Sequence, residues 1–201
     1  VLLQPNFDFD LFAKYGGVGP NLDLAQGYLV VMQHPVTTEY EAARSHITET
    51  LYAIKELDLP TFWFWPNVDA GSDGTSKGIR AFRELEKPAN IHFFKNMDPV
   101  DFLRLLYNSR GLIGNSSVGI RECSFLGVPV VNIGSRQAGR ERGQNVIDVG
   151  YDRHEIIKAV RHHLHNGRFP SDHLYGDGNA GKRIANLLST IDLRVEKKLT
   201  Y

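Results

Sequence analysis

The sequence predicts an α/β domain built on a parallel sheet with helices on both of its faces. Three observations lead to this fold class. Short apolar runs alternate with segments of helical periodicity through most of the 201 residues. The apolar runs are continuous, as in strands that helices cover on both sides. Polar, Gly-rich segments follow the runs, where an open parallel sheet places its ligand-binding loops.

The first part of the chain contains three predicted strands, each followed by a helix. Thr37 or Thr38 can cap the first helix, and Asp98 followed by Pro99 is a strong start signal for the third. The expected strands are residues 27–35, 60–67 and 90–94, and the expected helices are residues 38–57, 76–87 and 97–109.

A Gly-rich polar loop at residues 14–26 precedes the first strand. After the third helix, the second part of the chain continues the alternation of strands and helices. Two further strands flank one short helix, and a sixth strand leads into two closing helices. The expected strands are residues 111–114, 128–134 and 144–149, and the expected helices are residues 119–127, 153–166 and 178–191.

The charge balance excludes two classes of partner. Lys+Arg and Asp+Glu number 23 each, and the isoelectric point is near 7.2. Nucleic-acid and membrane-surface proteins depend on excess positive charge, so neither partner is expected. No apolar run has the length of a membrane span. The single cysteine, Cys123, is expected to be a small buried residue, and a cytoplasmic location fits best.

Five polar segments follow predicted strands and should converge on one edge of the sheet. They are residues 33–38, 66–74, 94–98, 114–119 and 134–143. Ligands of open α/β sheets bind outside the carboxyl ends of the strands, so these segments hold the candidate site.

The segment "GNSSVG" (residues 114–119) has two readings. Ser116 and Ser117 at a helix start can cradle a phosphate, because free N–H groups, the helix dipole and two hydroxyls converge there. A serine cap on a tight turn explains the same residues equally well. Glu122 in the following helix can accept hydrogen bonds from ribose hydroxyls or simply compensate the helix dipole.

Three further residues end strands at the same edge. Arg136 can clamp a diphosphate, whereas Arg142 in the same loop is expected to be solvated. His34 can transfer a proton or bind a phosphate, or it can be structural. Asn67 can read a base edge or a hydroxyl, or it can serve the turn. The cluster of His162, His163 and His165 is expected on a solvated helix face and not at a metal.

Four motifs together resemble the C-terminal half of hydrolysing UDP-N-acetylglucosamine 2-epimerases, and most closely the sialic-acid-pathway branch. They are "QHPVTTEY", "FWPNVDAGSDG", "IGNSSVGIRECSFLGVPVVNIGSRQAGRERGQNVIDV" and "YGDGNAGKRI". The resemblance covers residues 33–192, and the order and spacing of the motifs carry it.

The resemblance implies a glycosyltransferase-B-like fold of two Rossmann-like domains, of which this chain is the C-terminal half. It implies UDP-GlcNAc as substrate, elimination of UDP followed by water addition, and N-acetylmannosamine and UDP as products. It implies no metal and no nicotinamide cofactor, and a homo-oligomer. By matching motif positions, the resemblance assigns catalysis and phosphate contact to His34. It assigns the surroundings of the uridine to Asn67 and Phe102, and the ribose hydroxyls to Glu122. It assigns the diphosphate to Ser116, Ser117 and Arg136.

The resemblance also divides the chain. Residues 1–26, beginning "VLLQPNFDFD", resemble an interdomain hinge and loop region, and residues 27–201 resemble the UDP-binding domain. The family's N-terminal domain, which supplies the carboxylates that act on the sugar, is absent from this chain. We therefore expect the chain to hold nucleotide without turning over alone.

Three alternatives stay open. The substrate can be UDP-N,N′-diacetylbacillosamine, the chain can be a glycosyltransferase half-domain, or it can be a non-catalytic nucleotide-sugar-binding domain. Arg80 and Arg83 resemble a region that binds the feedback inhibitor CMP-sialic acid in the vertebrate enzyme. Residues 71–78 depart from that region, so this regulation is not carried over to the chain.

Overall fold

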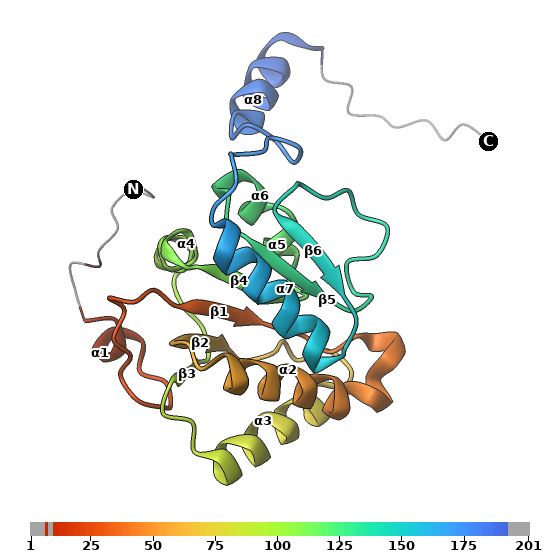
Figure 1. Cartoon of the computed structure of the whole chain (residues 1–201). Helices are drawn as coiled ribbons and strands as arrows, with labels where there is room; N and C mark the ends of the chain where they lie inside the picture. The colour runs from red at the N-terminus through yellow and green to blue at the C-terminus, as the bar shows by residue number, and fades with distance from the viewer. Residues whose placement is uncertain (1–6, 8–9, 193–201) are drawn as a thin grey trace.

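The computed structural model describes residues 7 and 10–192, and its centre is a six-stranded parallel sheet (Figure 1). The strand order is β3-β2-β1-β4-β5-β6, and every neighbouring pair is parallel. This is the order of a doubly wound Rossmann-like sheet. The predicted fold class is therefore confirmed. The strands are β1 (Leu29–Met32), β2 (Thr61–Phe64), β3 (Ile91–Phe94), β4 (Gly111–Gly114), β5 (Val130–Ile133) and β6 (Val146–Val149).

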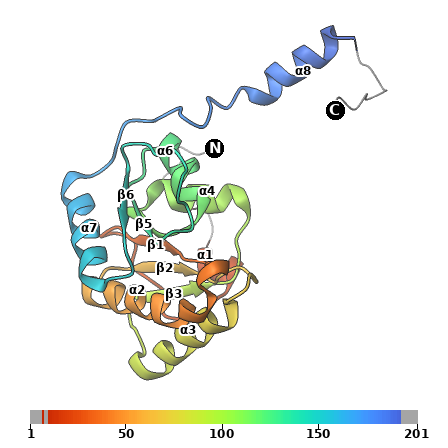
Figure 2. The same cartoon turned by 90° about the vertical axis from the view of Figure 1, so that its right-hand side faces the viewer.

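Helices cover both faces of the sheet, as Figures 1 and 2 show. One face packs against α2 (Ala43–Leu57), α3 (Ser72–Glu86) and α7 (Arg153–Asn166). The other face packs against α1 (Leu11–Tyr15), α4 (Pro99–Asn108), α5 (Ser117–Ile120) and α6 (Glu122–Leu126). The last helix, α8 (Ala180–Thr190), stands away from both layers.

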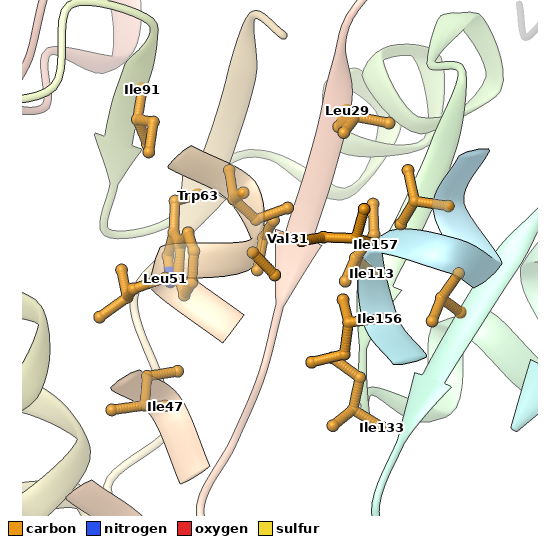
Figure 3. Close-up of a cluster of buried hydrophobic side chains, with 14 of the residues drawn as sticks. Leu29, Val31, Ile47, Leu51, Trp63, Ile91, Ile113, Ile133, Ile156 and Ile157 are labelled. Atoms are coloured by element: carbon orange, nitrogen blue, oxygen red, sulfur yellow. The ribbon is translucent and has the colours of Figure 1, made fainter. Parts of the chain in front are cut away.

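Alternate residues of each strand enter different cores, because successive strand side chains point to opposite faces. In β1, Leu29 and Val31 join the core beneath α2 and α7, while Val30 joins the core beneath α4. Figure 3 shows the first of these cores, in which Trp63 lies beside Leu51 of α2. All of these side chains are almost fully buried. Both faces are therefore apolar, which explains why the strand sequences do not alternate.

The start of α2 differs from the prediction. A 3-10 helix, η1 (Thr37–Ala42), precedes α2, and Val36 occupies the cap position of η1. Within the described residues, neither η1 nor α2 has a side-chain hydrogen bond at its cap, so the expected threonine cap is wrong. The backbone of Glu39 is non-helical (φ −125°, ψ 23°) and kinks η1.

The helix predicted over residues 119–127 is two short helices that break at Arg121 (φ −99°, ψ −69°). The hydroxyl of Ser124 donates to the carbonyl oxygen of Ile120 at 2.9 Å. A serine that bonds back to the carbonyl four residues earlier bends a helix. This contact gives the break a local cause.

The segment before β1 packs on the sheet. Leu11 and Leu22 are buried in the α4 side of the core, and Val18 forms an antiparallel bridge with Phe93 of the edge strand β3. The expected hinge motif falls mostly on residues 1–6 and 8–9, which lie outside the described part.

At the other end, α8 exposes an apolar side in which Ile184, Leu187 and Leu188 are each more than half exposed. Within residues 7 and 10–192, no helix is both long and apolar enough to cross a membrane.

Candidate functional site

The strand order reverses between β1 and β4, and this is where a doubly wound sheet opens a binding crevice. Gly114 ends β4 with φ +135°, and an added Cβ would lie 2.1 Å from the carbonyl oxygen of Met32. Only glycine permits so close an approach of the two strand ends. The segments after β1 and β4 are thereby brought together.

Asn115 joins these two segments. Its Oδ1 accepts from the backbone N–H of His34 at 2.7 Å, and its Nδ2 donates to the His34 carbonyl oxygen at 2.8 Å. Its own N–H donates to the carbonyl oxygen of Met32 at 3.0 Å. The side chain thus continues the β1–β4 ladder beyond the strands and fixes the backbone of His34.

His34 is 6% exposed, and its ring orientation is set by a backbone group of the next loop. The N–H of Asn67 donates to His34 Nδ1 at 3.1 Å. In a neutral imidazole the proton then resides on Nε2. Burial, aided by the positive charge of Arg136, lowers the pKa of His34 to about 4. At neutral pH the ring is therefore uncharged, with Nε2 as its donor.

Arg136 reaches the same point from the loop after β5. Its Nη1 donates to the carbonyl oxygen of Asn115 at 3.3 Å, and its Nη2 lies 3.7 Å from a carboxylate oxygen of Asp69. The buried Gln137 donates from Nε2 to the same Asn115 carbonyl at 2.7 Å. A partly exposed guanidinium therefore lies beside the His34 ring and the start of α5.

Ser116 caps α5, since its hydroxyl accepts from the N–H of Val118 at 3.4 Å. Ser116 is buried and Ser117 is partly exposed. Capping accounts for the Ser116 hydroxyl, but the first N–H groups of a helix have no partner within it. The cap and the anion-cradle readings are therefore compatible at this turn.

Glu122 lies apart from this network, in a cleft of about 310 Å³. The cleft runs between α4, α6 and residues 172–181, and Leu103, Phe125 and Tyr175 contribute apolar walls. Glu122 Oε2 is buried, and no side chain or backbone group of the described residues bonds to it. A carboxylate oxygen so placed is suited to accept a ligand hydroxyl.

The two residues expected around the uridine, Asn67 and Phe102, do not share one site in the structure. The side chain of Asn67 is exposed, and it is its backbone N–H that contacts His34. Phe102 of α4 packs edge-on against Phe64 at the end of β2, with ring centroids 5.1 Å apart. The structure brings His34, the Asn67 backbone and Arg136 together, with Ser116 and Ser117 beside them. The remaining two candidates are elsewhere: Glu122 lines the cleft, and Phe102 packs on the end of β2.

For two side chains, Arg142 and His163, the expected exposure to solvent is wrong. Arg142 is not solvated, because its Nε lies 2.6 Å from a carboxylate oxygen of Asp148 and its Nη2 donates to the Gln137 carbonyl at 3.0 Å. His163 is buried, and its Nε2 contacts the carbonyl oxygen of Val130 at 3.0 Å. The other two members of this histidine cluster, His162 and His165, are exposed as expected. Cys123 is buried as predicted, and burial raises the pKa of its thiol.

Sequence reasoning missed Asn115 and Gln137. Asn115 lies inside the quoted "GNSSVG" motif, directly after the glycine that ends a buried strand. Its position directly after a strand at the switch point of the sheet could have marked it as a candidate site residue. Gln137 had no such signal, because its contact with Asn115 depends on how the β5 loop folds back.

Comparison with known proteins identifies the family. The family model described as UDP-N-acetylglucosamine 2-epimerase matches residues 14–189. A UDP-N,N′-diacetylbacillosamine 2-epimerase (hydrolyzing) of Legionella pneumophila is 30% identical over 184 residues, which are 92% of this chain and 47% of that protein. The polysialic acid biosynthesis protein P7 of Escherichia coli is 35% identical over 153 residues, 75% of this chain and 37% of that protein. The chain thus spans less than half the length of these relatives.

Solved structures agree on the fold. The UDP-GlcNAc 2-epimerase of Neisseria meningitidis, bound to UDP-GlcNAc, superposes with a TM-score of 0.63 at 19% identity and covers 82% of this chain and 45% of its own. The UDP-GlcNAc 2-epimerase of Methanocaldococcus jannaschii gives a TM-score of 0.62 at 19% identity, over 84% and 47%. The chain belongs to the UDP-N-acetylglucosamine 2-epimerase family, and it corresponds to the C-terminal portion of its members.

Proposed function

We propose that the site at the β1–β4 switch point binds the diphosphate of a UDP-sugar, as the UDP-binding part of a hydrolysing UDP-GlcNAc 2-epimerase. The observation that carries the proposal is the meeting of Arg136, the α5 start and a neutral His34 around Asn115. These three groups are donors, and a diphosphate offers only acceptors.

The proposed reaction needs a leaving group whose growing negative charge is stabilised. The C1–O bond of the sugar breaks, a carboxylate from the other half of the enzyme accepts the proton on C2, and UDP leaves with the bonding electrons. Water then adds across the double bond to give N-acetylmannosamine. Arg136 and the N–H groups of α5 stabilise the departing diphosphate, as preorganised donors do wherever charge develops.

In this proposal His34 acts as a hydrogen-bond donor to phosphate. A backbone N–H already occupies Nδ1, and burial disfavours the imidazolium form, so the ring presents an Nε2–H near neutral pH. Protonation of the leaving group by His34 would first require the ring to become an imidazolium, which both the N–H bound at Nδ1 and the burial of the ring disfavour.

We assign the nucleoside to the neighbouring cleft. The unpartnered oxygen of Glu122 supports a contact with ribose hydroxyls. Phe102, which packs on Phe64 at the same sheet edge, and Asn67 are proposed to surround the uridine. Residues 1–26 are proposed as hinge and loop, and residues 27–201 as the UDP-binding domain.

Turnover is proposed to need more polypeptide than this chain provides. The carboxylates that act on the sugar would come from the other half of the relatives' length, and the working protein would be a homo-oligomer. The exposed apolar side chains of α8 support a missing partner surface. The isolated chain should therefore bind UDP without releasing N-acetylmannosamine.

The experiment is a calorimetric titration of UDP into the 201-residue chain and two variants, Arg136→Ala and Ser116→Ala. Both variants should bind UDP more weakly. The matched control is Arg140→Ala, which removes an equal charge from an exposed position in the same loop. Equal affinities for the chain and the Arg136→Ala variant would sink the assignment, and so would a chain that does not bind UDP.

A second candidate substrate is UDP-N,N′-diacetylbacillosamine, which the name of the Legionella pneumophila relative favours. Both substrates share UDP, so the test must use a protein with both halves. Supplying each UDP-sugar and identifying the released sugar by mass spectrometry separates them. A glycoside product formed with an added acceptor would instead identify a glycosyltransferase.

A further inference from the structure

Glu39 accepts contacts from three other parts of the chain. The Ser135 hydroxyl donates to Glu39 Oε1, and the Tyr151 hydroxyl donates to Oε2 at 2.7 Å. His46 Nδ1 lies 3.8 Å from Oε2, and the His46 ring stacks on Tyr151 with centroids 3.5 Å apart and planes 3° apart. Both carboxylate oxygens are thus engaged.

Two of these partners, Ser135 and Tyr151, are distant from Glu39 in the sequence. Glu39 follows β1, Ser135 follows β5, and Tyr151 follows β6, whereas His46 belongs to α2. Glu39 and Ser135 are 96 residues apart, and Glu39 and Tyr151 are 112 apart. One carboxylate therefore ties together three loops at the binding edge of the sheet.

The backbone is shaped to permit these contacts. Glu39 has the non-helical conformation that kinks η1. Gly134, with φ +74°, leaves space for Tyr151, because a Cβ there would lie 2.2 Å from the Tyr151 hydroxyl. Glycine is the residue that adopts this conformation without strain.

Ser135 is the immediate neighbour of Arg136, so the contact from Glu39 limits the movement of the loop that carries the guanidinium. Arg136 itself has weak restraints, at 3.3 Å from the Asn115 carbonyl and 3.7 Å from Asp69. The hydrogen bonds from Ser135 and Tyr151 lower the pKa of Glu39, which is therefore ionised at neutral pH and accepts charge-assisted hydrogen bonds.

We infer that Glu39 is a positioning residue that holds the Ser135–Arg136 loop so that Arg136 is preorganised for the diphosphate. The ligand side of this inference depends on the proposed function, since it takes Arg136 as a diphosphate contact. Glu39 does not touch the ligand and acts through Arg136. Preorganised donors bind more tightly because less conformational freedom is lost on binding.

The test combines four chains with UDP calorimetry: the unaltered chain, Glu39→Ala, Arg136→Ala and the double variant. Glu39→Ala should weaken UDP binding about five- to tenfold, because a long side chain that is no longer held in place loses more conformational freedom on binding. In the Arg136→Ala background the same change should have no further effect, because interacting positions are non-additive. Glu39→Gln, which keeps one acceptor oxygen, should recover most of the affinity.

The matched control is Glu49→Ala. Glu49 lies on α2, as His46 does, and binds Arg153 through two contacts of 3.3 Å, and no hydrogen bond between Glu49 and Ser135 occurs within the described residues. It should destabilise the chain without changing UDP affinity. If Glu39→Ala does not fold, Ser135→Ala removes one contact alone and should weaken UDP binding about threefold.

Two results of the UDP titrations overturn the inference: an unchanged affinity in Glu39→Ala, or an equal loss of affinity in both backgrounds. A ligand-free measurement separates this from failure of the proposed function. NMR relaxation of the Arg136 Nε–Hε group should show greater mobility in Glu39→Ala. If the unaltered chain does not bind UDP, the function fails, yet unchanged Arg136 mobility would independently refute the positioning role.

Discussion

Replacing Asn115 with Ala should destabilise the domain because it leaves two backbone groups of a buried residue without partners. The His34 N–H loses its acceptor at 2.7 Å, and the His34 carbonyl loses its donor at 2.8 Å. Each unsatisfied buried group costs roughly 1–3 kcal/mol. Partial relaxation toward solvent leaves an expected loss of roughly 2–4 kcal/mol in the free energy of unfolding.

Urea denaturation followed by circular dichroism measures this loss. In a domain of this size, each kcal/mol lowers the melting temperature by roughly 2–4 °C. The control is Asn90→Ala, which removes one exposed hydrogen bond of 2.9 Å to Asp58 and should cost about 0.5 kcal/mol or less. Equal stabilities of the Asn115→Ala and Asn90→Ala variants would refute the role given to Asn115.

Asn115→Asp sharpens the same test. The aspartate keeps the acceptor for the His34 N–H but directs an oxygen at the His34 carbonyl in place of a donor. It should be at least as unstable as Asn115→Ala, although its side chain is the same size. An aspartate as stable as the unaltered chain would show that the Nδ2 contact contributes nothing.

Three further predictions concern separate parts of the fold. Gly134→Ala should displace Tyr151 and lower the free energy of unfolding by roughly 1–3 kcal/mol, because Gly134 has φ +74° and its new Cβ would lie 2.2 Å from the Tyr151 hydroxyl. An unchanged denaturation midpoint would contradict this. Burial lowers the pKa of His34 to about 4, so the stability that the neutral ring contributes is complete above about pH 6.5 and is lost as pH falls toward 4. NMR titration of the ring measures this pKa, and a midpoint near 6.5 would refute it. Asp101→Asn should loosen α1, because the buried carboxylate lies 2.6 Å from Lys14 Nζ; hydrogen exchange of the α1 amides should accelerate while that of β1 does not.

Local signals predicted the elements whose ends are set by neighbouring residues. The predicted bounds of α7 match the structure, in which Asp152 caps the start of the helix through its own side chain and Gly167 follows its end. Those of β4 were predicted because Gly111 and Gly114 enclose two apolar residues. The start of α2 was not, since the kink in η1 lies at Glu39, whose side chain bonds to distant loops.

The candidate site divides in the same way. Ser116 and Arg136 could be named as candidates because a helix start and the end of a strand are recognisable from neighbouring residues in the sequence. The burial of His163 was not found, because it depends on a contact with Val130, 33 residues away. Neither was the engagement of Arg142 by Asp148, which joins a loop to the following strand. Periodicity carries no information on such pairs.

The adjacency of β1 and β4 also sets an order of events during synthesis. His34 and Asn115 are 81 residues apart, and β2, α3 and β3 are made between them. A nascent chain therefore completes β1 long before β4, the second of its two neighbouring strands, leaves the ribosome. Closing a loop of this length is slow compared with forming local helices. The proposed nucleotide affinity, which needs the joined ends of β1 and β4, would thus arise only after this closure, and nucleotide binding would then report that the two strands have paired.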